Sequence, residues 1–518
     1  MNSTPVETDK GYCSQPDKGN YDTMICVSIG RTRHKMMIAE HHQLAQNGAE
    51  LVEYRLDWLS HQPDLSRLFG DRPTPIVATC RRMEDYGRWK GSEDQRQALL
   101  RAAIAAEIEY IDLEDDIAGS IPRYGKTKRI VSHHNFNETP DDLEEIHQRM
   151  CRLDPDIVKL VTMANKPADM VRMLKLVAAA PVPTVGFCMG EFGMASRILC
   201  AKYGSPFTYA SFSEDREMAP GQISFKDMKN MYRYDEINSG TKVFAVIGDP
   251  IAHSKSPLIH NAAFAHEKLN NIYVPFRIPS DLLLETLRAF EWFQIQGYSI
   301  TIPHKEECVE YCDFPDETCK TVGAANTWYR DHANRWRASN TDYESALATI
   351  RLGLSAGGST ETSLNGKTAL ILGAGGVSRA IAHGLMKAGC GVTITNRTNK
   401  RGEALAKELG CRHTTWENRG AQTADILVNC TPIGMFPYMD ETPFQPHWLQ
   451  DGMLVFDTIY NPENTLLLKD ARNHNCKVAS GLEMFVRQAA LQYERFTQRE
   501  APLECMREAL RKGISPIN

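Results

Sequence analysis

The sequence predicts an α/β protein with an N-terminal (β/α)8 TIM barrel, followed by a second region of two α/β domains, one of the Rossmann type. Three observations support this fold class. The chain has 518 residues, which is too long for one hydrophobic core. Eight short apolar runs alternate with helical stretches between residues 24 and 212, the count of a β/α barrel. A new α/β pattern begins with VFAVIGDP at residues 243–250 and includes a strand, a glycine-rich turn and a helix from residue 368.

The composition is that of a soluble globular protein and disfavours two classes of partner. The chain is 42% hydrophobic and 24% charged, with a net charge of −6 and a pI of about 6.3. Proteins that bind nucleic acid usually carry a basic excess. No apolar run approaches the roughly 20 residues of a membrane span. We therefore expect neither nucleic acid nor a membrane as a partner.

The cysteines and the N-terminus indicate a cytoplasmic protein without a metal site. The 14 cysteines include no Cys-x-x-Cys pair, which disfavours metal binding and indicates reduced thiols. The first 23 residues are polar, contain no arginine and resemble neither a signal peptide nor a transit peptide. We expect a disordered tail over residues 1–23.

The eight apolar runs are the expected barrel strands. They are separated by stretches of helical spacing, such as 141–153 and 168–180, and lie at residues 24–30, 51–57, 75–81, 110–115, 129–135, 156–163, 183–190 and 206–212. We expect the barrel to span residues 24–225. The polar stretch 226–242, which contains Ser-Gly near its end, is the expected linker.

Lys159 lies inside the apolar run DIVKLV and is the first candidate catalytic residue. Burying an ammonium without a partner is costly and lowers its pKa. A lysine that is partly neutral near pH 7 can attack a carbonyl and form an imine. The alternative is a lysine near a strand end whose ammonium reaches solvent.

Two adjacent histidines, His133 and His134, lie at the C-terminal end of the fifth expected strand, where β/α barrels place catalysis. A neutral imidazole there could move protons for imine chemistry. Adjacent strand residues point to opposite sides, so these residues alone do not choose between the two.

Other polar residues lie at the ends of neighbouring strands. Glu53 and Arg55 have a period of two, which places them on one strand face, and a Glu–Arg pair in the barrel mouth suits recognition of hydroxyls or a carboxylate. Arg81 ends the third strand, and Arg197 follows the seventh. Any single arginine is more simply a surface ion pair, but their convergence with a histidine and a lysine favours a binding site.

In combination, the segments EYRLD, TCR, SHHNF, DIVKL, MGEFGMASR and APGQIS resemble type I 3-dehydroquinate dehydratase over residues 24–225. The resemblance implies an eight-stranded barrel that dehydrates 3-dehydroquinate to 3-dehydroshikimate through a lysine Schiff base. It implies Lys159 as the imine-forming lysine and His134, rather than His133, as the catalytic histidine. Arg197 would hold the substrate carboxylate, and the hydroxyls and neighbouring atoms would be held by Ser28, Glu53, Arg55, Arg81 and Gln222.

Two positions depart from the pattern of this family. Asp85 replaces a glutamate in the substrate site, and we expect it to orient His134 from a shorter side chain. Met218 replaces a serine or threonine. The lost hydroxyl is expected to weaken substrate binding or loop closure.

Residues 368–401 have the pattern of a strand, a glycine turn, a helix and a second strand. The turn, made of Gly373, Ala374, Gly375, Gly376 and Val377, allows a pyrophosphate to approach the helix N-terminus. Ser378 replaces the third glycine of the usual G-x-G-x-x-G, so the strand and helix around the motif, rather than the motif itself, favour a dinucleotide site.

The end of the second strand favours NADP over NAD. An NAD site places an acid on the ribose about 20 residues after the glycines. Asn396 stands there instead, followed by Arg397, Thr398, Lys400 and Arg401. A neutral residue followed by cations suits a 2′-phosphate, and the alternative is a solvated basic loop.

Four further motifs provide a candidate substrate site: HSKSP (253–257), SITIPHK (299–305), GAANT (323–327) and NTDYESA (340–346). Ser254 and Ser256 have a strand-like spacing that lets both face a ligand. Lys305 and Asp342 form a candidate pair, because a lysine beside an aspartate can shuttle the proton that accompanies hydride transfer. Taken singly, these residues would be turn residues and helix caps.

With NCTPIGM (429–435), DTIYNP (457–462) and GLEMFVRQA (481–489), these motifs resemble shikimate dehydrogenase over residues 243–515. The resemblance implies Lys305 and Asp342 as the catalytic dyad, with Thr458 and Gly481 lining the nicotinamide. The implied shikimate-binding residues are Ser254, Ser256, Thr301, Asn326, Tyr460 and Gln488. Ser299 and Tyr343 replace an asparagine and a glycine of the family, which leaves the relative use of shikimate and quinate open.

The two resemblances imply a consecutive pair of activities in aromatic amino acid biosynthesis. The dehydrogenase half would have a substrate domain over 243–341 and 483–518 and a Rossmann-type NADP domain over 342–482. It would reduce 3-dehydroshikimate to shikimate with NADPH and without a metal. The alternatives are a catabolic quinate or shikimate dehydrogenase that uses NAD, and a non-catalytic quinate sensor. Retention of Lys159, His134, Lys305 and Asp342 argues against the sensor. The sequence does not predict the oligomeric state.

Overall fold

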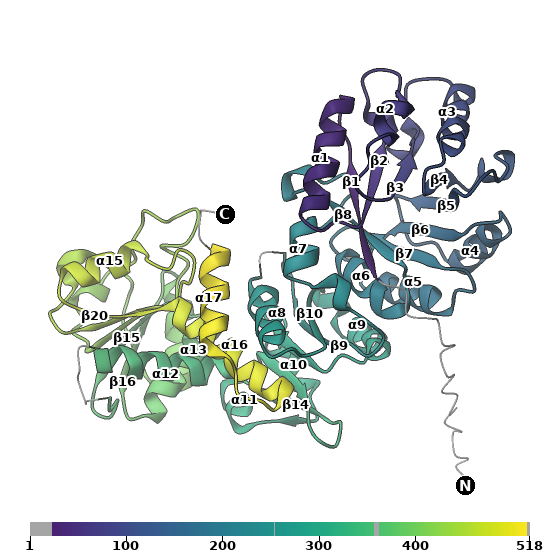
Figure 1. The fold of residues 1–518 in the computed structure, drawn as a ribbon. Coiled ribbons are helices and arrows are strands. Elements are labelled where there is room, and N and C mark those ends of the chain that lie inside the picture. The colour runs from purple at the N-terminus through teal and green to yellow at the C-terminus, as the bar shows by residue number, and fades with distance from the viewer. Residues whose placement is uncertain (1–22, 253, 357–361, 515–518) are drawn as a thin grey trace, which may run out of the picture. The chain divides into compact units, whose positions relative to one another are not determined.

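A computed structural model of the chain describes residues 23–252, 254–356 and 362–514 (Figure 1). The expected disordered tail falls on residues 1–23, of which 1–22 lie outside the described residues, as does His253 of the HSKSP motif. The chain divides into two compact units, Met1–Thr241 and Lys242–Asn518. Each unit is described by itself.

The first unit is a barrel of eight parallel strands, and all eight expected strands are present. In chain order they are β1 (Met24–Ile29), β2 (Leu51–Arg55), β3 (Ile76–Thr79), β4 (Tyr110–Glu114), β5 (Lys128–Asn135), β6 (Ile157–Met163), β7 (Thr184–Met189) and β8 (Phe207–Ser211). From β1 to β6 each strand pairs with the next one along the chain, and β8 pairs with β1. Within the described residues no backbone ladder joins β7 to β8, where the rings of Phe187 and Tyr209 lie 6.3 Å apart.

Helices cover the outside of this barrel, as its near-continuous apolar strands require (Figure 1). They are α1 (His34–Gln46), α2 (Leu65–Phe69), α3 (Glu93–Ala105), α4 (Leu143–Cys151), α5 (Ala168–Ala179), α6 (Met194–Leu199) and α7 (Phe225–Asn230). Helix α3 begins with a capping box, in which Ser92 Oγ accepts from the Gln95 backbone and Gln95 Oε1 accepts from the Ser92 backbone.

The polar segment after the barrel is part of the first unit, so the expected linker over 226–242 is wrong. Most of this segment, up to Thr241, belongs to the first unit, and strand β9 (Lys242–Gly248) begins directly after it. Although the segment is polar in composition, Met228, Tyr232 and Tyr234 within it are buried. Three widely spaced large side chains are enough to pack the segment against the barrel, and a composition-based prediction overlooks them.

The second unit contains two sheets, the first of which is mixed. Its strand order is β10-β9-β11-β13-β14-β12, with β10, β9 and β11 parallel and β13 antiparallel to both of its neighbours. The new strands are β10 (Asn271–Arg277), β11 (Gly297–Ile300), β12 (Phe314–Pro315), β13 (Thr327–Arg330) and β14 (Trp336–Ser339). The helices that accompany it are α8 (Ser256–His266), α9 (Leu283–Phe290), α10 (Glu307–Glu310) and α11 (Glu317–Val322).

The second sheet is parallel and has the order β17-β16-β15-β18-β19-β20. Its strands are β15 (Thr368–Leu372), β16 (Gly391–Thr395), β17 (Arg412–His413), β18 (Ile426–Asn429), β19 (Leu454–Asp457) and β20 (Lys477–Ser480). Its helices are α12 (Thr341–Ser355), α13 (Gly376–Lys387), α14 (Asn399–Leu409) and α15 (Leu466–Asn473). The strand order reverses at β15, where doubly wound sheets bind nucleotides.

The last two helices, α16 (Gly481–Thr497) and α17 (Leu503–Ile514), return to the first sheet of this unit. Val486 and Tyr493 of α16 and Met506 of α17 share a buried cluster with Phe244 and Phe264. The two sheets fall inside the ranges expected for a substrate domain and a nucleotide domain, and the boundaries themselves stay a prediction. No helix in the described ranges is both long and apolar enough to span a bilayer.

Candidate active sites

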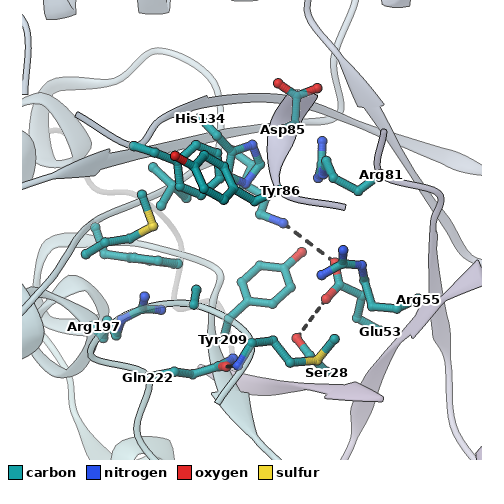
Figure 2. A pocket seen from close by; sticks show the side chains of 17 residues that line it. Ser28, Glu53, Arg55, Arg81, Asp85, Tyr86, His134, Arg197, Tyr209 and Gln222 are labelled. Carbon is teal, nitrogen blue, oxygen red and sulfur yellow. Dashed lines mark hydrogen bonds and ion pairs between the residues drawn. The ribbon is translucent and has the colours of Figure 1, made fainter. Parts of the chain in front are cut away.

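One pocket in the barrel is lined by all nine residues that the sequence analysis placed in the first site (Figure 2). They come from β1, β2, β5 and β6 and from the segments after β3, β7 and β8, so the pocket lies at the C-terminal ends of the strands. These residues are Ser28, Glu53, Arg55, Arg81, Asp85, His134, Lys159, Arg197 and Gln222. The remaining lining residues are Tyr86, Phe136, Val161, Phe187, Met189, Tyr209, Met218 and Ala219.

Lys159 is buried in the pocket wall, so the alternative of a solvent-reaching lysine is wrong. Its side chain is 6% exposed, and its Nζ lies 3.1 Å from Asp112 Oδ2 and 3.7 Å from Glu53 Oε1. The ring of Tyr209 lies beneath the ammonium, with its centroid 3.9 Å from Nζ. The ammonium is therefore paired, contrary to the expectation of an isolated charge. Burial would raise the pKa of Asp112, but Arg81 and then Lys159 outweigh it and hold that pKa well below its usual range.

The structure distinguishes the two histidines. His134 lines the pocket and stacks on Phe136, with ring centroids 5.8 Å apart, whereas His133 pairs with Asp115 at 3.1 Å. Burial, and after it the charges of Arg81 and Lys159, holds the pKa of His134 well below its usual range. The imidazole is therefore neutral at pH 7 and can accept a proton.

Asp85 lines the pocket but is not bonded to His134. Its carboxylate accepts from Arg82 Nε at 2.5 Å, and no hydrogen bond joins it to His134 in the described part of the chain. The expectation that Asp85 orients His134 therefore does not match this geometry. The shorter side chain of Asp85 pairs with the neighbouring Arg82 instead.

Arg197, on α6, is a buried cation. Its side chain is 1% exposed, and its guanidinium lies 4.3 Å from the centroid of the Phe187 ring. Its Nη2 donates to the Pro220 carbonyl at 3.3 Å, while its buried Nε has no hydrogen-bond partner. Burial lowers the pKa of Arg197 to about 10, which leaves it charged at neutral pH. Among the described residues no carboxylate forms an ion pair with it, so the site suits an anionic ligand.

Glu53 and Arg55 both line the pocket, as their shared strand face predicts, but each is bonded to other residues. Arg55 makes a two-point contact with Asp57, at 2.9 and 2.8 Å. Glu53 instead accepts from Ser28 at 2.7 Å and from Thr79 at 2.8 Å. Asp57 takes the guanidinium because it follows two residues later, where the strand has ended and the chain turns back.

The segment between β8 and α7 carries Gln222 and Met218 into the pocket. Gln222 Oε1 accepts from the Met218 backbone N–H at 3.0 Å, which leaves its amide N–H groups for a ligand. The Met218 methyl lies beside Gly30, where a Cβ atom would be only 2.6 Å away. Met218 thus packs against the loop after β1 and offers no hydroxyl to the site.

In the second unit, Lys305 and Asp342 form the expected pair. Lys305 Nζ donates to Asp342 Oδ2 at 2.5 Å, with the two side chains 22% and 13% exposed. Lys305 lies in the turn that follows β11, and Asp342 lies in the first turn of α12, whose N-cap is Asn340. A partly exposed, paired lysine can hold a proton and pass it to a ligand oxygen.

The other residues implied for the substrate site of this unit lie on several elements. Asn326 bonds with Thr341 through both its amide oxygen and its amide nitrogen, at 2.8 and 2.9 Å, and so fixes the start of α12. Tyr460 stacks on Phe485, and Gln488 donates to the Phe485 carbonyl at 3.0 Å. Thr301 follows β11 directly.

The expected strand-like spacing of Ser254 and Ser256 is wrong. Ser256 opens helix α8, and Ser254 lies before it, where its hydroxyl accepts from the Ser256 backbone N–H at 3.3 Å. A proline directly after Ser256 favours a helix start over a strand.

The two positions that depart from the shikimate dehydrogenase pattern have structural partners. Ser299 donates to Gln492 at 2.7 Å, within a buried network that includes Thr327. The Tyr343 ring packs between α12 and α13, 5.9 Å from the His383 ring.

The glycine turn between β15 and α13 fits a dinucleotide. Gly373 has a φ of +114°, and a Cβ there would lie 2.9 Å from the Cys430 carbonyl oxygen. Gly375 and Gly376 face open space, in which a Cβ would meet nothing within 4 Å. Ser378, at the place of the third glycine, is buried and accepts from the Gly375 backbone N–H at 3.3 Å. Ala374 and Val377 are half-buried beside this cradle.

The loop after β16 carries cations at the same edge of the sheet as the glycine turn after β15, because the two strands are parallel neighbours. Arg397, Lys400 and Arg401 are exposed, and no ion pair engages them within the described ranges. Asn396 donates to the Thr398 carbonyl at 3.0 Å. This donor set fits a 2′-phosphate. On the other side, Thr458 donates to the Asn429 carbonyl at 2.8 Å, and a Cβ on Gly481 would lie 2.4 Å from the Thr458 carbonyl, which leaves no room for a side chain.

Several site residues were not expected from the sequence. Asp112, Thr79 and Tyr209 surround Lys159 or Glu53, and the period of two shared by Asp112 and Glu114 in YIDLED was the available signal for the first. No signal in the sequence marks Tyr209, which reads as an ordinary core residue. No group of three or more His, Cys, Asp or Glu side chains in the described part of the chain could hold a metal ion.

Sequence profiles of known families match most of the chain. The type I 3-dehydroquinase profile matches residues 25–239, and the shikimate dehydrogenase substrate binding domain matches residues 246–328. The shikimate / quinate 5-dehydrogenase profile matches residues 356–434, and the shikimate 5′-dehydrogenase C-terminal domain matches residues 481–511.

Individual relatives agree with these matches. The chain is 37% identical over 503 residues to the chloroplastic bifunctional 3-dehydroquinate dehydratase/shikimate dehydrogenase of Arabidopsis thaliana, covering 93% of this chain and 83% of the relative. It is 36% identical over 292 residues to the shikimate dehydrogenase (NADP(+)) of Moorella thermoacetica, covering 54% of this chain and 96% of that one. Among solved structures, shikimate 5-dehydrogenase from Thermus thermophilus with NADP(H) and shikimate covers 52% of this chain and 99% of its own, with 33% identity and a TM-score of 0.47.

Proposed function

This chain belongs to the family of bifunctional 3-dehydroquinate dehydratase/shikimate dehydrogenases of the shikimate pathway, and we propose how its residues carry the two activities. The barrel dehydrates 3-dehydroquinate to 3-dehydroshikimate through an imine on Lys159. The second unit reduces 3-dehydroshikimate to shikimate with NADPH. The observation that carries the first assignment is a single pocket in which a buried lysine, a neutral histidine and an unpaired arginine meet.

In the dehydratase, Arg197 binds the substrate carboxylate and sets the orientation of the ring. Lys159 Nζ forms a bond to the ketone carbon, and the ketone oxygen leaves as water, which gives the imine. The imine acidifies the adjacent C–H, and His134 takes that proton. The C–O bond of the neighbouring hydroxyl then breaks, and the proton on His134 leaves with the oxygen as water. A further water hydrolyses the imine, which releases the product and restores Lys159.

Other polar groups of the pocket hold the substrate hydroxyls. Glu53 is fixed by Ser28 and Thr79, so its carboxylate accepts from a hydroxyl in one geometry. Arg55, Arg81 and Gln222 supply donors, and Asp85 closes the pocket edge beside Tyr86. These roles agree with the side chains that converge in Figure 2.

In the dehydrogenase, Lys305 gives a proton to the carbonyl oxygen of 3-dehydroshikimate, and Asp342 holds the lysine in place and offsets its charge. When bound, NADPH supplies the hydride for the carbonyl carbon. The glycine turn receives its pyrophosphate, and Arg397, Lys400 and Arg401 bind its 2′-phosphate, with Asn396 and Thr398 beside them. Ser254, Ser256, Thr301, Asn326, Tyr460 and Gln488 hold the substrate, while Thr458 and Gly481 line the nicotinamide.

Experiments can distinguish this function from two alternatives, an NAD-linked quinate or shikimate dehydrogenase and a non-catalytic sensor. The basic loop after β16 supports NADP over NAD, and comparing both cofactors with shikimate and with quinate tests that choice. A sensor without catalysis disagrees with the intact Lys305–Asp342 pair and the buried Lys159. We also propose that the enzyme works in the cytoplasm, which the free thiols of all described cysteines support.

Borohydride trapping tests the imine. Reduction in the presence of 3-dehydroquinate is expected to leave a covalent adduct on Lys159, located by peptide mass spectrometry. Lys159→Ala is expected to lose the adduct and dehydration, because Lys159 is the one lysine among the described residues that line the pocket. Lys128→Ala, an exposed lysine on the neighbouring strand β5, is the matched control and should label normally. An adduct on another lysine, or dehydration by wild type without any adduct, would contradict the assignment.

A further inference from the structure

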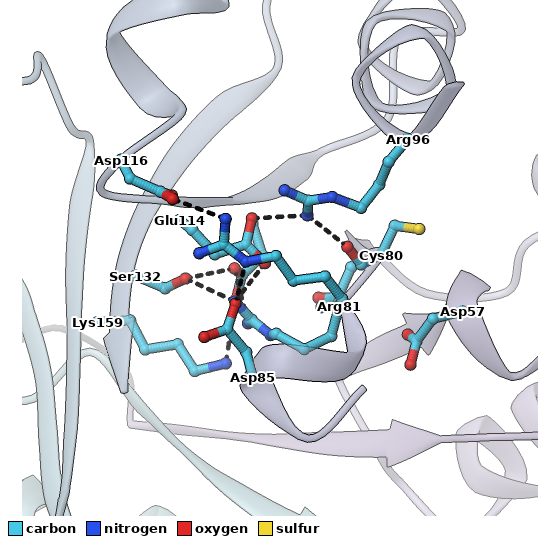
Figure 3. A network of polar contacts seen from close by, with 12 residues as sticks. Asp57, Cys80, Arg81, Asp85, Arg96, Glu114, Asp116, Ser132 and Lys159 are labelled. Carbon is cyan, nitrogen blue, oxygen red and sulfur yellow. Dashed lines mark hydrogen bonds and ion pairs between the residues drawn. The ribbon is translucent and has the colours of Figure 1, made fainter. Parts of the chain in front are cut away.

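A chain of buried charges runs from helix α3 to Lys159 (Figure 3). Its members in order are Arg96, Glu114, Arg81, Asp112 and Lys159, with alternating sign. All five residues are 5% exposed or less. Arg96 lines no part of the pocket, so any effect of Arg96 on the reaction passes through its neighbours.

Each carboxylate in this chain divides its two oxygens between two neighbours. Asp112 Oδ2 accepts from Lys159 at 3.1 Å, and its Oδ1 accepts from Arg81 Nη2 at 2.9 Å and from Ser132 Oγ at 2.6 Å. Glu114 Oε1 accepts from Arg81 Nη1 at 2.8 Å, and its Oε2 accepts from Arg96 Nη1 at 2.8 Å. The position of each group is therefore set by the next one outward.

Arg96 holds the outer end of the chain at several points. Its Nη1 also donates to the Cys80 carbonyl at 2.7 Å, directly before Arg81 in the chain. Its Nε and Nη2 donate to Glu93 at 2.8 and 2.9 Å, in the first turn of the same helix. Arg96 thus fixes both the backbone that precedes Arg81 and the carboxylate that Arg81 binds.

Stability alone is a weak reason for such an arrangement. The desolvation of buried ion pairs often cancels their attraction, and apolar replacements of similar volume are frequently as stable. Lysine has four rotatable bonds, so an accurately placed nucleophile needs partners that do not move themselves. Charged groups in buried networks that end on a reacting atom supply that rigidity.

We propose that Arg96 is a positioning residue of the dehydratase, which acts through Glu114 and Arg81 to hold Asp112 and, with it, the nitrogen of Lys159 in the attacking position. The proposal rests on the proposed imine mechanism. It assigns Arg96 no contact with substrate.

The test uses the full-length enzyme with Arg96→Lys and, separately, Glu114→Gln. Either variant lowers the folded fraction to some degree. The dehydration rate is therefore divided by the number of enzyme molecules that can form the imine on Lys159. Borohydride trapping at saturating 3-dehydroquinate, run to its end point, counts the barrels that still form the imine on Lys159. Initial dehydration rates divided by that count give the turnover of correctly folded molecules.

We expect each variant to lower this turnover by about 10- to 100-fold, since small misplacements of a reacting group have effects of that size. We expect KM to change by less than about 2-fold, because Arg197 and Glu53 still bind the substrate. The double variant should cost no more than Glu114→Gln alone, because both residues act along one path. Arg101→Lys, an exposed arginine on the same helix that donates to Gln97, is the control and should match wild type.

The results distinguish failure of the proposed imine mechanism from failure of the positioning role of Arg96. If wild type shows no adduct on Lys159, the proposed mechanism fails. If wild type is trapped on Lys159 and both variants keep their turnover per imine-forming molecule within about 2-fold of wild type, Arg96 is only structural and the positioning role is overturned. Additive losses in the double variant would equally contradict a single path.

Discussion

Single residues decide the chemistry of the barrel, and the neighbours of each residue set its charge. Burial and two nearby cations keep His134 neutral, while His133, one residue earlier on the same strand, pairs with Asp115 outside the pocket. Arg197 is the opposite case, because it stays charged although it is buried and pairs with no carboxylate among the described residues. A neutral base and an unpaired cation are the two features that a carboxylate-bearing substrate requires of this pocket.

The lowered pKa of His134 makes a prediction about pH. Because the imidazole stays unprotonated to well below its usual range, kcat/KM for dehydration should stay level as the pH falls from about 7.5 to 6. If the base were a histidine of ordinary pKa, kcat/KM would fall with a midpoint at about pH 6.5. The measurement is a pH profile of kcat/KM at constant ionic strength. His133→Gln should leave the profile unchanged, and an acid limb centred near the ordinary histidine value would contradict the assignment.

The position of a residue at a strand end was enough to predict that its side chain lines the pocket. The bonding partner of each side chain was not predictable, because it depends on residues elsewhere in the fold. The barrel period and strand ends were sufficient to place Lys159 and Arg81 in one pocket, whereas the choice of His134 over His133 came from the family resemblance. The shared face of Glu53 and Arg55 was predictable, but the contact of Arg55 with Asp57, beyond the strand, was not. Arg96 could not be predicted, because helix α3 shows charged residues on several faces and only the fold reveals which one is buried.

At the scale of elements, the segment between β8 and α7 closes one side of the barrel pocket. It carries Met218 and Gln222, and it is tied to helix α1 by Arg216, whose Nη1 lies 2.6 Å from Glu40 Oε1. Arg31, after β1, donates to the same carboxylate. Helix α1 therefore anchors the segment that places Gln222.

This anchor predicts an effect on substrate binding. Arg216→Ala should raise KM for 3-dehydroquinate by about 2- to 5-fold, the size of a partly exposed ion pair, with little change in kcat. The difference between variant and wild type should shrink as salt is added, because the pair is screened.

A matched surface pair provides the control for this anchor. Arg123→Ala removes a pair with Asp154 and Asp156, which precede β6 at the opposite end of the barrel, and should leave KM unchanged. Equal KM values for wild type and Arg216→Ala at low salt would show that the segment is held by packing alone.

Elements were more predictable than the connections between them. All eight barrel strands and the glycine turn follow from apolar runs and local chemistry. The segment around α7 was misjudged as a linker because several buried side chains, among them Met228, Tyr232 and Tyr234, lie within a polar stretch. Ser254 and Ser256 were misjudged because a period of two also occurs where a turn meets a helix start.

At the scale of the whole molecule, the chain joins two compact units with complementary chemistry. The first has a pocket with a buried lysine and a buried arginine, and the second has a Lys–Asp pair and a glycine turn that fits a dinucleotide. The product proposed for the first is the substrate proposed for the second. Both sites must therefore be active in one chain, and the barrel must act before the second unit.

The most direct test gives the full-length chain 3-dehydroquinate and NADPH together and follows NADPH consumption and product identity. Wild type should form shikimate and consume one NADPH for each molecule formed. Lys305→Ala should accumulate 3-dehydroshikimate, because the proton donor is lost and the second step slows by about 10²- to 10⁴-fold. Lys159→Ala should leave 3-dehydroquinate unchanged yet still reduce added 3-dehydroshikimate. Shikimate formation from 3-dehydroquinate by Lys159→Ala, or its absence with wild type, would contradict the account.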